Sequence, residues 1–115
     1  PFHCSLMLPA AEKLRVRLAQ MNFSIPQIPV LNNVDVTQLT DPETIKELLV
    51  RQAASPVRWV EIMQAMQTMG VTHVIECGPG KVLSGLAKRC DERLTGLAMA
   101  DLAGIDAALT LLNTH

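Results

Sequence analysis

Aromatic residues are scarce in this chain: two Phe, one Trp and no Tyr make up 3% of its 115 residues. Charged residues are also sparse, at 18%, and the formal net charge is −1. Nucleic-acid binding depends on clustered positive charge and on aromatic surfaces for stacking, but the ten Lys and Arg residues are scattered. The composition therefore disfavours a nucleic-acid-binding protein.

Long hydrophobic runs are missing as well. No apolar stretch reaches the roughly 18–20 residues that span a bilayer, and the apolar segment at 97–100 is interrupted at once by Asp101. No secretory signal is recognisable. Apolar residues nevertheless make up 49% of the chain, which is too many for disorder. We expect a folded, cytoplasmic protein without a membrane partner.

The three cysteines, Cys4, Cys77 and Cys90, lack CxxC spacing, so a disulfide framework or a structural zinc site is not indicated. Unpaired thiols fit a reducing compartment, and we expect Cys77 and Cys90 to be buried as small apolar side chains. His73 and Cys77 could share one face of a strand, but no third metal ligand lies near them in the sequence. No metal or other cofactor is expected.

Apolar periodicity and turn residues predict alternating helices and strands. Asp41, Pro42 and Glu43 have the order of an N-cap, a first-turn proline and a first-turn acid. Such alternation is typical of an α/β fold with a parallel sheet covered by helices. The expected helices are 10–21, 42–52, 56–69, 81–90 and 106–112, and about three short strands are expected at 30–36, 73–77 and 95–100.

Two polar motifs admit more than one reading. The loop Gly78-Pro79-Gly80-Lys81 lacks the spacing of a phosphate-binding loop, so we interpret it as a tight strand-to-helix turn. Asn32, Asn33 and Asp35 follow an apolar stretch. They could face a ligand crevice at the carboxyl end of a strand, or they could form an Asx turn that ends the strand.

His3 is the strongest candidate for chemistry, although a lone histidine is more often structural. Cys4 adjoins it, but neighbouring residues seldom direct their side chains at each other, which disfavours a Cys-His nucleophilic pair. The surrounding motifs favour a catalytic role for His3. In order along the chain they are Pro1-Phe2-His3-Cys4 with Met7-Leu8-Pro9-Ala10-Ala11, Pro29-Val30-Leu31-Asn32-Asn33-Val34-Asp35, Leu49-Val50-Arg51-Gln52, Ser55-Pro56-Val57-Arg58-Trp59 and Glu76-Cys77-Gly78-Pro79-Gly80-Lys81-Val82-Leu83.

These motifs resemble, in the same order, the C-terminal third or more of the malonyl-CoA:acyl-carrier-protein transacylases of bacterial fatty acid synthesis. The resemblance implies the C-terminal part of a larger α/β-hydrolase-like acyltransferase fold. It implies that a serine attacks the malonyl thioester and that His3 is the general base. Gln52 matches a glutamine whose backbone carbonyl orients the histidine, because an acceptor on one ring N–H leaves the other nitrogen free as base.

The chain departs from the family by what it lacks. It contains no Gly-x-Ser-x-Gly motif, and none of its arginines matches the one that pairs with the malonyl carboxylate. We therefore expect residues 1–115 to be the C-terminal portion of an acyltransferase domain. The implied partners are malonyl-CoA, acyl carrier protein, and the missing N-terminal part or another copy of the chain. Alternatives are a fragment of a polyketide synthase acyltransferase domain and a non-catalytic carrier-protein-binding module.

Overall fold

The computed structural model describes residues 2–114, so Pro1 of the first motif lies outside the described residues. The chain divides into two compact units, Pro1–Ile62 and Met63–His115, and each is described by itself. The boundary falls within helix α3 (Trp59–Thr68). No helix in the described part of the chain is long and apolar enough to cross a membrane.

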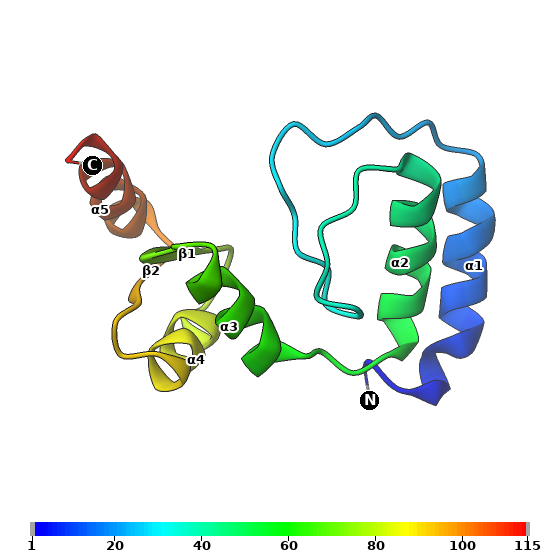
Figure 1. Cartoon of the computed structure of the whole chain (residues 1–115), viewed down its shortest axis with the longest axis horizontal. Coiled ribbons are helices and arrows are strands. Elements are labelled where there is room, and N and C mark those ends of the chain that lie inside the picture. The colour runs from blue at the N-terminus through cyan, green and yellow to red at the C-terminus, as the bar shows by residue number, and fades with distance from the viewer. Residues whose placement is uncertain (1, 115) are drawn as a thin grey trace. The chain divides into compact units, whose positions relative to one another are not determined.

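The first unit is built on two helices that pack side by side, α1 (Leu8–Ala19) and α2 (Pro42–Ala54) (Figure 1). A short 3-10 helix, η1 (Ser5–Met7), precedes α1 and contacts both of them. The apolar periodicity at 10–21 thus corresponds to a helix that begins two residues earlier. The buried core between α1 and α2 consists of Ala11, Leu18 and Val50, with Leu14, Phe23 and Ala53 packed against them.

Helix α2 buries a lysine, Lys46, although charged side chains are seldom buried. Lys46 is only 9% exposed. Its Nζ donates to the carbonyl oxygen of Met21 at 2.6 Å and to Glu43 at 3.1 Å, and it lies 5.4 Å from the centre of the Phe23 ring. These contacts satisfy the ammonium group, which makes its burial tolerable. Ile45, Leu48 and Leu49 on another side of α2 line a groove described below, and Leu48 is buried there.

The strand predicted at 30–36 does not form. Leu31 and Gln38 make an isolated antiparallel bridge, and a turn lies between them. The Asn32 side-chain oxygen accepts the backbone N–H groups of Val34 at 3.1 Å and Asp35 at 2.7 Å. This Asx turn offers those N–H groups an alternative to a strand ladder. Of the two readings of the polar motif, the Asx turn is therefore the one confirmed.

The second unit contains a parallel sheet of two strands, β1 (His73–Cys77) and β2 (Thr95–Met99), with His73 opposite Thr95 and Cys77 opposite Met99. Helix α4 (Val82–Cys90) packs against both strands, and α5 (Leu102–Asn113) packs against β2 (Figure 1). The α/β class is thus confirmed. Within the described residues the sheet has two strands rather than about three, because 30–36 forms a turn.

A glycine turn joins β1 to α4, as the sequence predicts. Gly78 and Gly80 have φ of 132° and 98°, values that side chains with a Cβ rarely adopt. The carboxylate of Glu76 accepts the backbone N–H of Ser84 at 2.9 Å, and it thereby satisfies one free donor in the first turn of α4. The prediction that Cys77 and Cys90 are buried is wrong, since both are exposed.

Helix α5 begins four residues earlier than the pattern at 106–112 predicts. The Asp101 side chain caps it by accepting the N–H of Gly104 at 2.8 Å. The glycine in its first turn hid this start, because glycine is a poor helix former. The structure shows why glycine is required there: a Cβ at residue 104 would overlap the carbonyl oxygen of Ala98 in β2.

We therefore predict that Gly104→Ala separates α5 from β2 and lowers the free energy of unfolding by roughly 1–3 kcal/mol, the usual cost of overpacking. Gly85→Ala is the matched control. Gly85 lies inside α4 with nothing within 4 Å of an added Cβ, so that substitution should stabilise the helix by about 0.5–1 kcal/mol. Urea unfolding followed by circular dichroism compares the two. Equal effects would contradict the close packing of α5 on β2.

The N-cap of α2 is a carboxylate, Asp41, so the stability of this helix should depend on pH. Asp41 accepts the hydroxyl and the backbone N–H of Thr44, at 2.5 and 2.9 Å. These bonds lower the pKa of its carboxyl group. Because the folded pKa lies below the unfolded value of about 3.9, the stabilisation is present above that pH and is lost as pH falls through the folded pKa.

Asn at this position caps a helix nearly as well as Asp but does not titrate. Wild type should therefore melt at a higher temperature than Asp41→Asn at pH 7, and the difference should shrink below about pH 4. Thermal melts across this range measure it. A difference that stays constant or grows on acidification would contradict the prediction.

Candidate functional site

The structure brings together the two site residues that the sequence singled out. The Nδ1 atom of His3 lies 2.9 Å from the backbone carbonyl oxygen of Gln52, although 49 positions separate them in the sequence. A carbonyl can only accept a hydrogen bond, so Nδ1 carries the proton when the imidazole is neutral. The second ring nitrogen, Nε2, then holds a lone pair and can act as a base. The ring is exposed, so that nitrogen is accessible.

The backbone conformation of His3 and Cys4 positions the imidazole ring beside α2. His3 has φ of 56°, in the left-handed region, and Cys4 follows in an extended conformation. A left-handed conformation in a residue with a Cβ is uncommon and concentrates at functional sites. The 3-10 helix η1 then packs on α1 and α2. These contacts anchor the segment beside α2, whose last turn contains Gln52.

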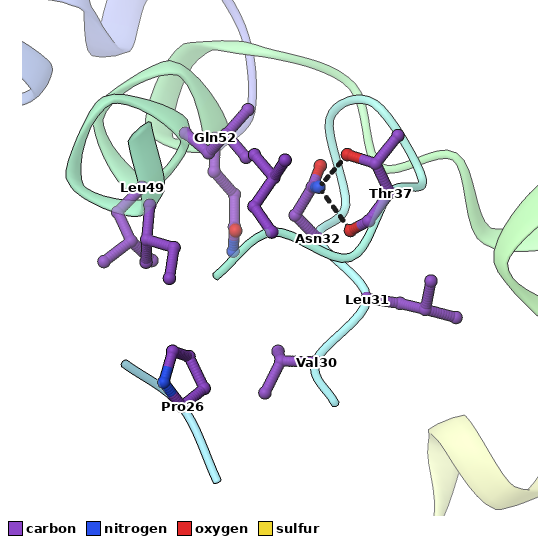
Figure 2. Close-up of a pocket in the computed structure, with 10 residues that line it drawn as sticks. Pro26, Val30, Leu31, Asn32, Thr37, Leu49 and Gln52 are labelled. Atoms are coloured by element: carbon purple, nitrogen blue, oxygen red, sulfur yellow. Dashed lines mark hydrogen bonds between the residues drawn. The ribbon is translucent and has the colours of Figure 1, made fainter. Parts of the chain in front are cut away.

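Gln52 has a second role through its side chain. It lines a groove of about 160 Å³ between α2 and the segment that follows α1 (Figure 2). Most of the lining is apolar, and the polar groups are Asn32, Thr37 and Gln52. The Asn32 amide nitrogen donates to the carbonyl and the hydroxyl oxygens of Thr37, at 2.7 and 2.8 Å (Figure 2). The apolar lining residues are Pro26, Val30, Leu31, Leu39, Ile45, Leu48 and Leu49.

Two arginines tie the 32–37 turn to its neighbours. Arg51 forms two hydrogen bonds with the Asp35 carboxylate, at 3.0 and 3.1 Å. Arg58 donates from its side chain to the carbonyl of Val34 and from its backbone to the carbonyl of Asn33, both at 3.3 Å. Sequence reasoning missed both contacts, because no local pattern indicates a pairing across 16 or 24 positions.

Two of the remaining ion pairs join exposed side chains, whereas a third involves Asp91, whose side chain is only 12% exposed. Arg15 bonds to Glu47, which raises the pKa of the guanidinium and lowers that of the carboxyl group. The hydrogen bond between Arg58 and Glu61 likewise raises the pKa of the arginine and lowers the pKa of the glutamate. Arg93 donates to Asp91 from its backbone N–H at 3.0 Å and from its side chain at 3.1 Å, and these bonds lower the pKa of that carboxyl group. Exposed pairs of this kind contribute little to stability.

A serine hydroxyl and a cluster of metal ligands are the other groups that could take part in chemistry. The hydroxyl of Ser84 donates to the carbonyl of Lys81 at 3.0 Å within α4, in the second unit. Among residues 2–114, no three His, Cys, Asp or Glu side chains gather as metal ligands would. Residues 2–114 thus present a histidine whose ring is oriented by a main-chain carbonyl.

Comparison with known proteins identifies relatives of this chain. The chain is 50% identical over 110 residues to the malonyl CoA-acyl carrier protein transacylase of Salmonella typhimurium, and the match covers 96% of the chain. The chain is homologous to the C-terminal portion of these transacylases. It spans about a third of the length of the curated relatives it matches, 36% in the Salmonella enzyme. No protein-family model matches the chain.

Solved structures agree with this homology. The acyl-carrier-protein S-malonyltransferase of Burkholderia pseudomallei superimposes with a TM-score of 0.88 at 56% identity, over 96% of this chain and 36% of that one. A malonyl transacylase solved in complex with a type II polyketide acyl-carrier protein gives 0.89 at 46% identity, with the same coverage of each chain. The fold described above is therefore that of the matching third of these enzymes.

Proposed function

We propose that this chain contributes the base-bearing part of an enzyme that transfers malonyl groups from coenzyme A to acyl carrier protein in fatty acid synthesis. The observation that carries the proposal is the hydrogen bond from His3 Nδ1 to the Gln52 carbonyl, in a chain homologous to malonyl transacylases. The bond gives one defined tautomer and one available basic nitrogen. Residues 1–115 then form the C-terminal portion of the acyltransferase domain.

In the proposed reaction His3 Nε2 moves a proton twice in each half of the transfer. It takes the proton of a serine hydroxyl supplied by other sequence, while the serine oxygen attacks the malonyl thioester. The imidazolium then protonates the departing coenzyme A thiolate. In the second half, Nε2 takes the proton of the carrier protein's phosphopantetheine thiol, which attacks the malonyl ester. Return of that proton to the serine oxygen restores the starting state.

The Gln52 carbonyl supports both halves of this cycle. It accepts a hydrogen bond from Nδ1–H throughout, so the ring keeps its orientation when Nε2 gains or loses a proton. No cofactor takes part in this scheme; the partners are malonyl-CoA, acyl carrier protein and the serine-bearing part of the enzyme.

A polyketide pathway is the second candidate. A relative 46% identical to this chain has been solved with a type II polyketide acyl-carrier protein. The two pathways would differ in the carrier protein rather than in the role of His3. Transfer rates to carrier proteins of each pathway would separate them.

The role of His3 is tested in a chimera in which residues 1–115 replace the matching third of the Salmonella transacylase. His3→Ala should lower the malonyl transfer rate by about 10²–10⁴-fold, the usual size of general-base assistance. His73→Ala is the control, because the His73 ring pairs with the Thr72 hydroxyl rather than with the Gln52 carbonyl, and it should keep most of the activity. A folded His3→Ala chimera that retains more than about a tenth of the rate would show that His3 is structural.

The chain by itself should transfer no malonyl group from coenzyme A to carrier protein. A base accelerates the attack of a nucleophile, and the sequence contains no Gly-x-Ser-x-Gly motif to provide one. Incubation of the purified chain with radiolabelled malonyl-CoA and carrier protein measures this. Transfer that is abolished by His3→Ala, and so does not come from a contaminant, would overturn the proposed division of the site.

A further inference from the structure

The carbonyl that holds His3 belongs to the last turn of α2, where its usual helical partner is missing. In an α-helix the carbonyl of residue i accepts the N–H of residue i+4. For Gln52 that residue is Pro56, which has no N–H. The Gln52 oxygen instead accepts a long contact of 3.5 Å from Ser55 N–H and the 2.9 Å bond from His3.

Pro56 also ends the helix by restricting the residue before it. The proline ring disfavours the helical region for its predecessor and moves it to extended angles. Ser55 has φ of −113° and ψ of 150°, and α2 ends at Ala54. Helical carbonyls point along the axis toward the C-terminus. A partner of Gln52 therefore approaches from the side where a further turn of helix would otherwise lie.

We propose that Pro56 is a positioning residue for His3: it keeps the Gln52 carbonyl open so that the imidazole, rather than a backbone N–H, is its partner. The proline acts in two ways, by lacking the N–H of residue 56 and by keeping Ser55 out of the helix. The consequence for catalysis rests on the proposed function. The consequence for the tautomer of His3 rests on geometry alone.

Pro42, inside α2 at its start, provides a matched comparison for Pro56, which lies just beyond the end of that helix. Pro42 occupies the first turn of α2, where an N–H has no helical partner in any case. Pro42→Ala removes a proline ring and restores a backbone N–H, as Pro56→Ala does, but it leaves residues 52–56 unchanged. Pro56 and Pro42 therefore differ in one relevant respect, which is whether the missing N–H would compete for the Gln52 carbonyl.

The test is the tautomer of His3 in the full chain with ¹⁵N-labelled histidine, assigned by the loss of its signals in His3→Gln. Wild type should show the Nδ1–H form at neutral pH. Pro56→Ala restores the N–H and favours helix, so the ratio of Nδ1–H to Nε2–H forms should fall about fivefold, the equivalent of one ordinary hydrogen bond. Pro56→Gly restores the N–H but disfavours helix, so its ratio should lie between those of wild type and Pro56→Ala.

Pro42→Ala should leave the ratio as in wild type. A ratio unchanged in both folded Pro56 variants, or a shift of equal size in Pro42→Ala, would overturn the proposal. If Pro56→Ala loses part of its helix, the tautomer ratios of Pro56→Gly and Pro42→Ala still test the proposal. If the wild-type chimera proved inactive while the tautomer responded as expected, the proposed function would fail and the role of Pro56 would stand.

Discussion

One hydrogen bond, from the His3 ring to the backbone carbonyl of Gln52, fixes the orientation of the imidazole in the first unit. An exposed histidine rotates freely and exchanges its proton between two nitrogens. The carbonyl removes that freedom because it can only accept. The acceptor is also part of the main chain, so its position depends on where α2 ends and on how α2 is packed, rather than on a side-chain rotamer.

Helix α2 can hold this acceptor because it is supported on two sides. Its Val50 and Lys46 side packs on α1, and the opposite side meets the turn that Asn32 stabilises. Arg51 joins the last turn of the helix to Asp35 in that turn. Each contact is modest by itself, and exposed ion pairs in particular contribute little. Together they place a fixed end of a helix beside the left-handed His3.

The sequence alone was sufficient for the elements with strong local signals. Asp41 and Pro42 marked the start of α2, and the apolar run at 73–77 marked β1. Prediction failed where a side chain altered the usual backbone pairing or where packing outweighed propensity. Asn32 turned a predicted strand into an Asx turn, and Gly104 hid the first turn of α5.

The site divides in the same way. His3 and Gln52 were named through resemblance to a family, since nothing in local spacing connects residues 49 positions apart. The ties made by Arg51 and Arg58 had no signal in a single sequence, because a surface arginine can pair with any carboxylate in reach. The helix predicted to start at Pro56 begins instead at Trp59, and the effect of Pro56 on α2 depends on the bond between His3 and the Gln52 carbonyl, which no local pattern indicates.

The central claim is that the Gln52 carbonyl holds His3 in one tautomer with Nε2 free. A neutron structure of the deuterated protein at neutral pH tests it most directly, because it locates the proton itself. The account predicts a deuteron on Nδ1 directed at the Gln52 oxygen and none on Nε2 of the neutral ring. A deuteron on Nε2 with Nδ1 bare, or a ring turned away from the carbonyl, would contradict it.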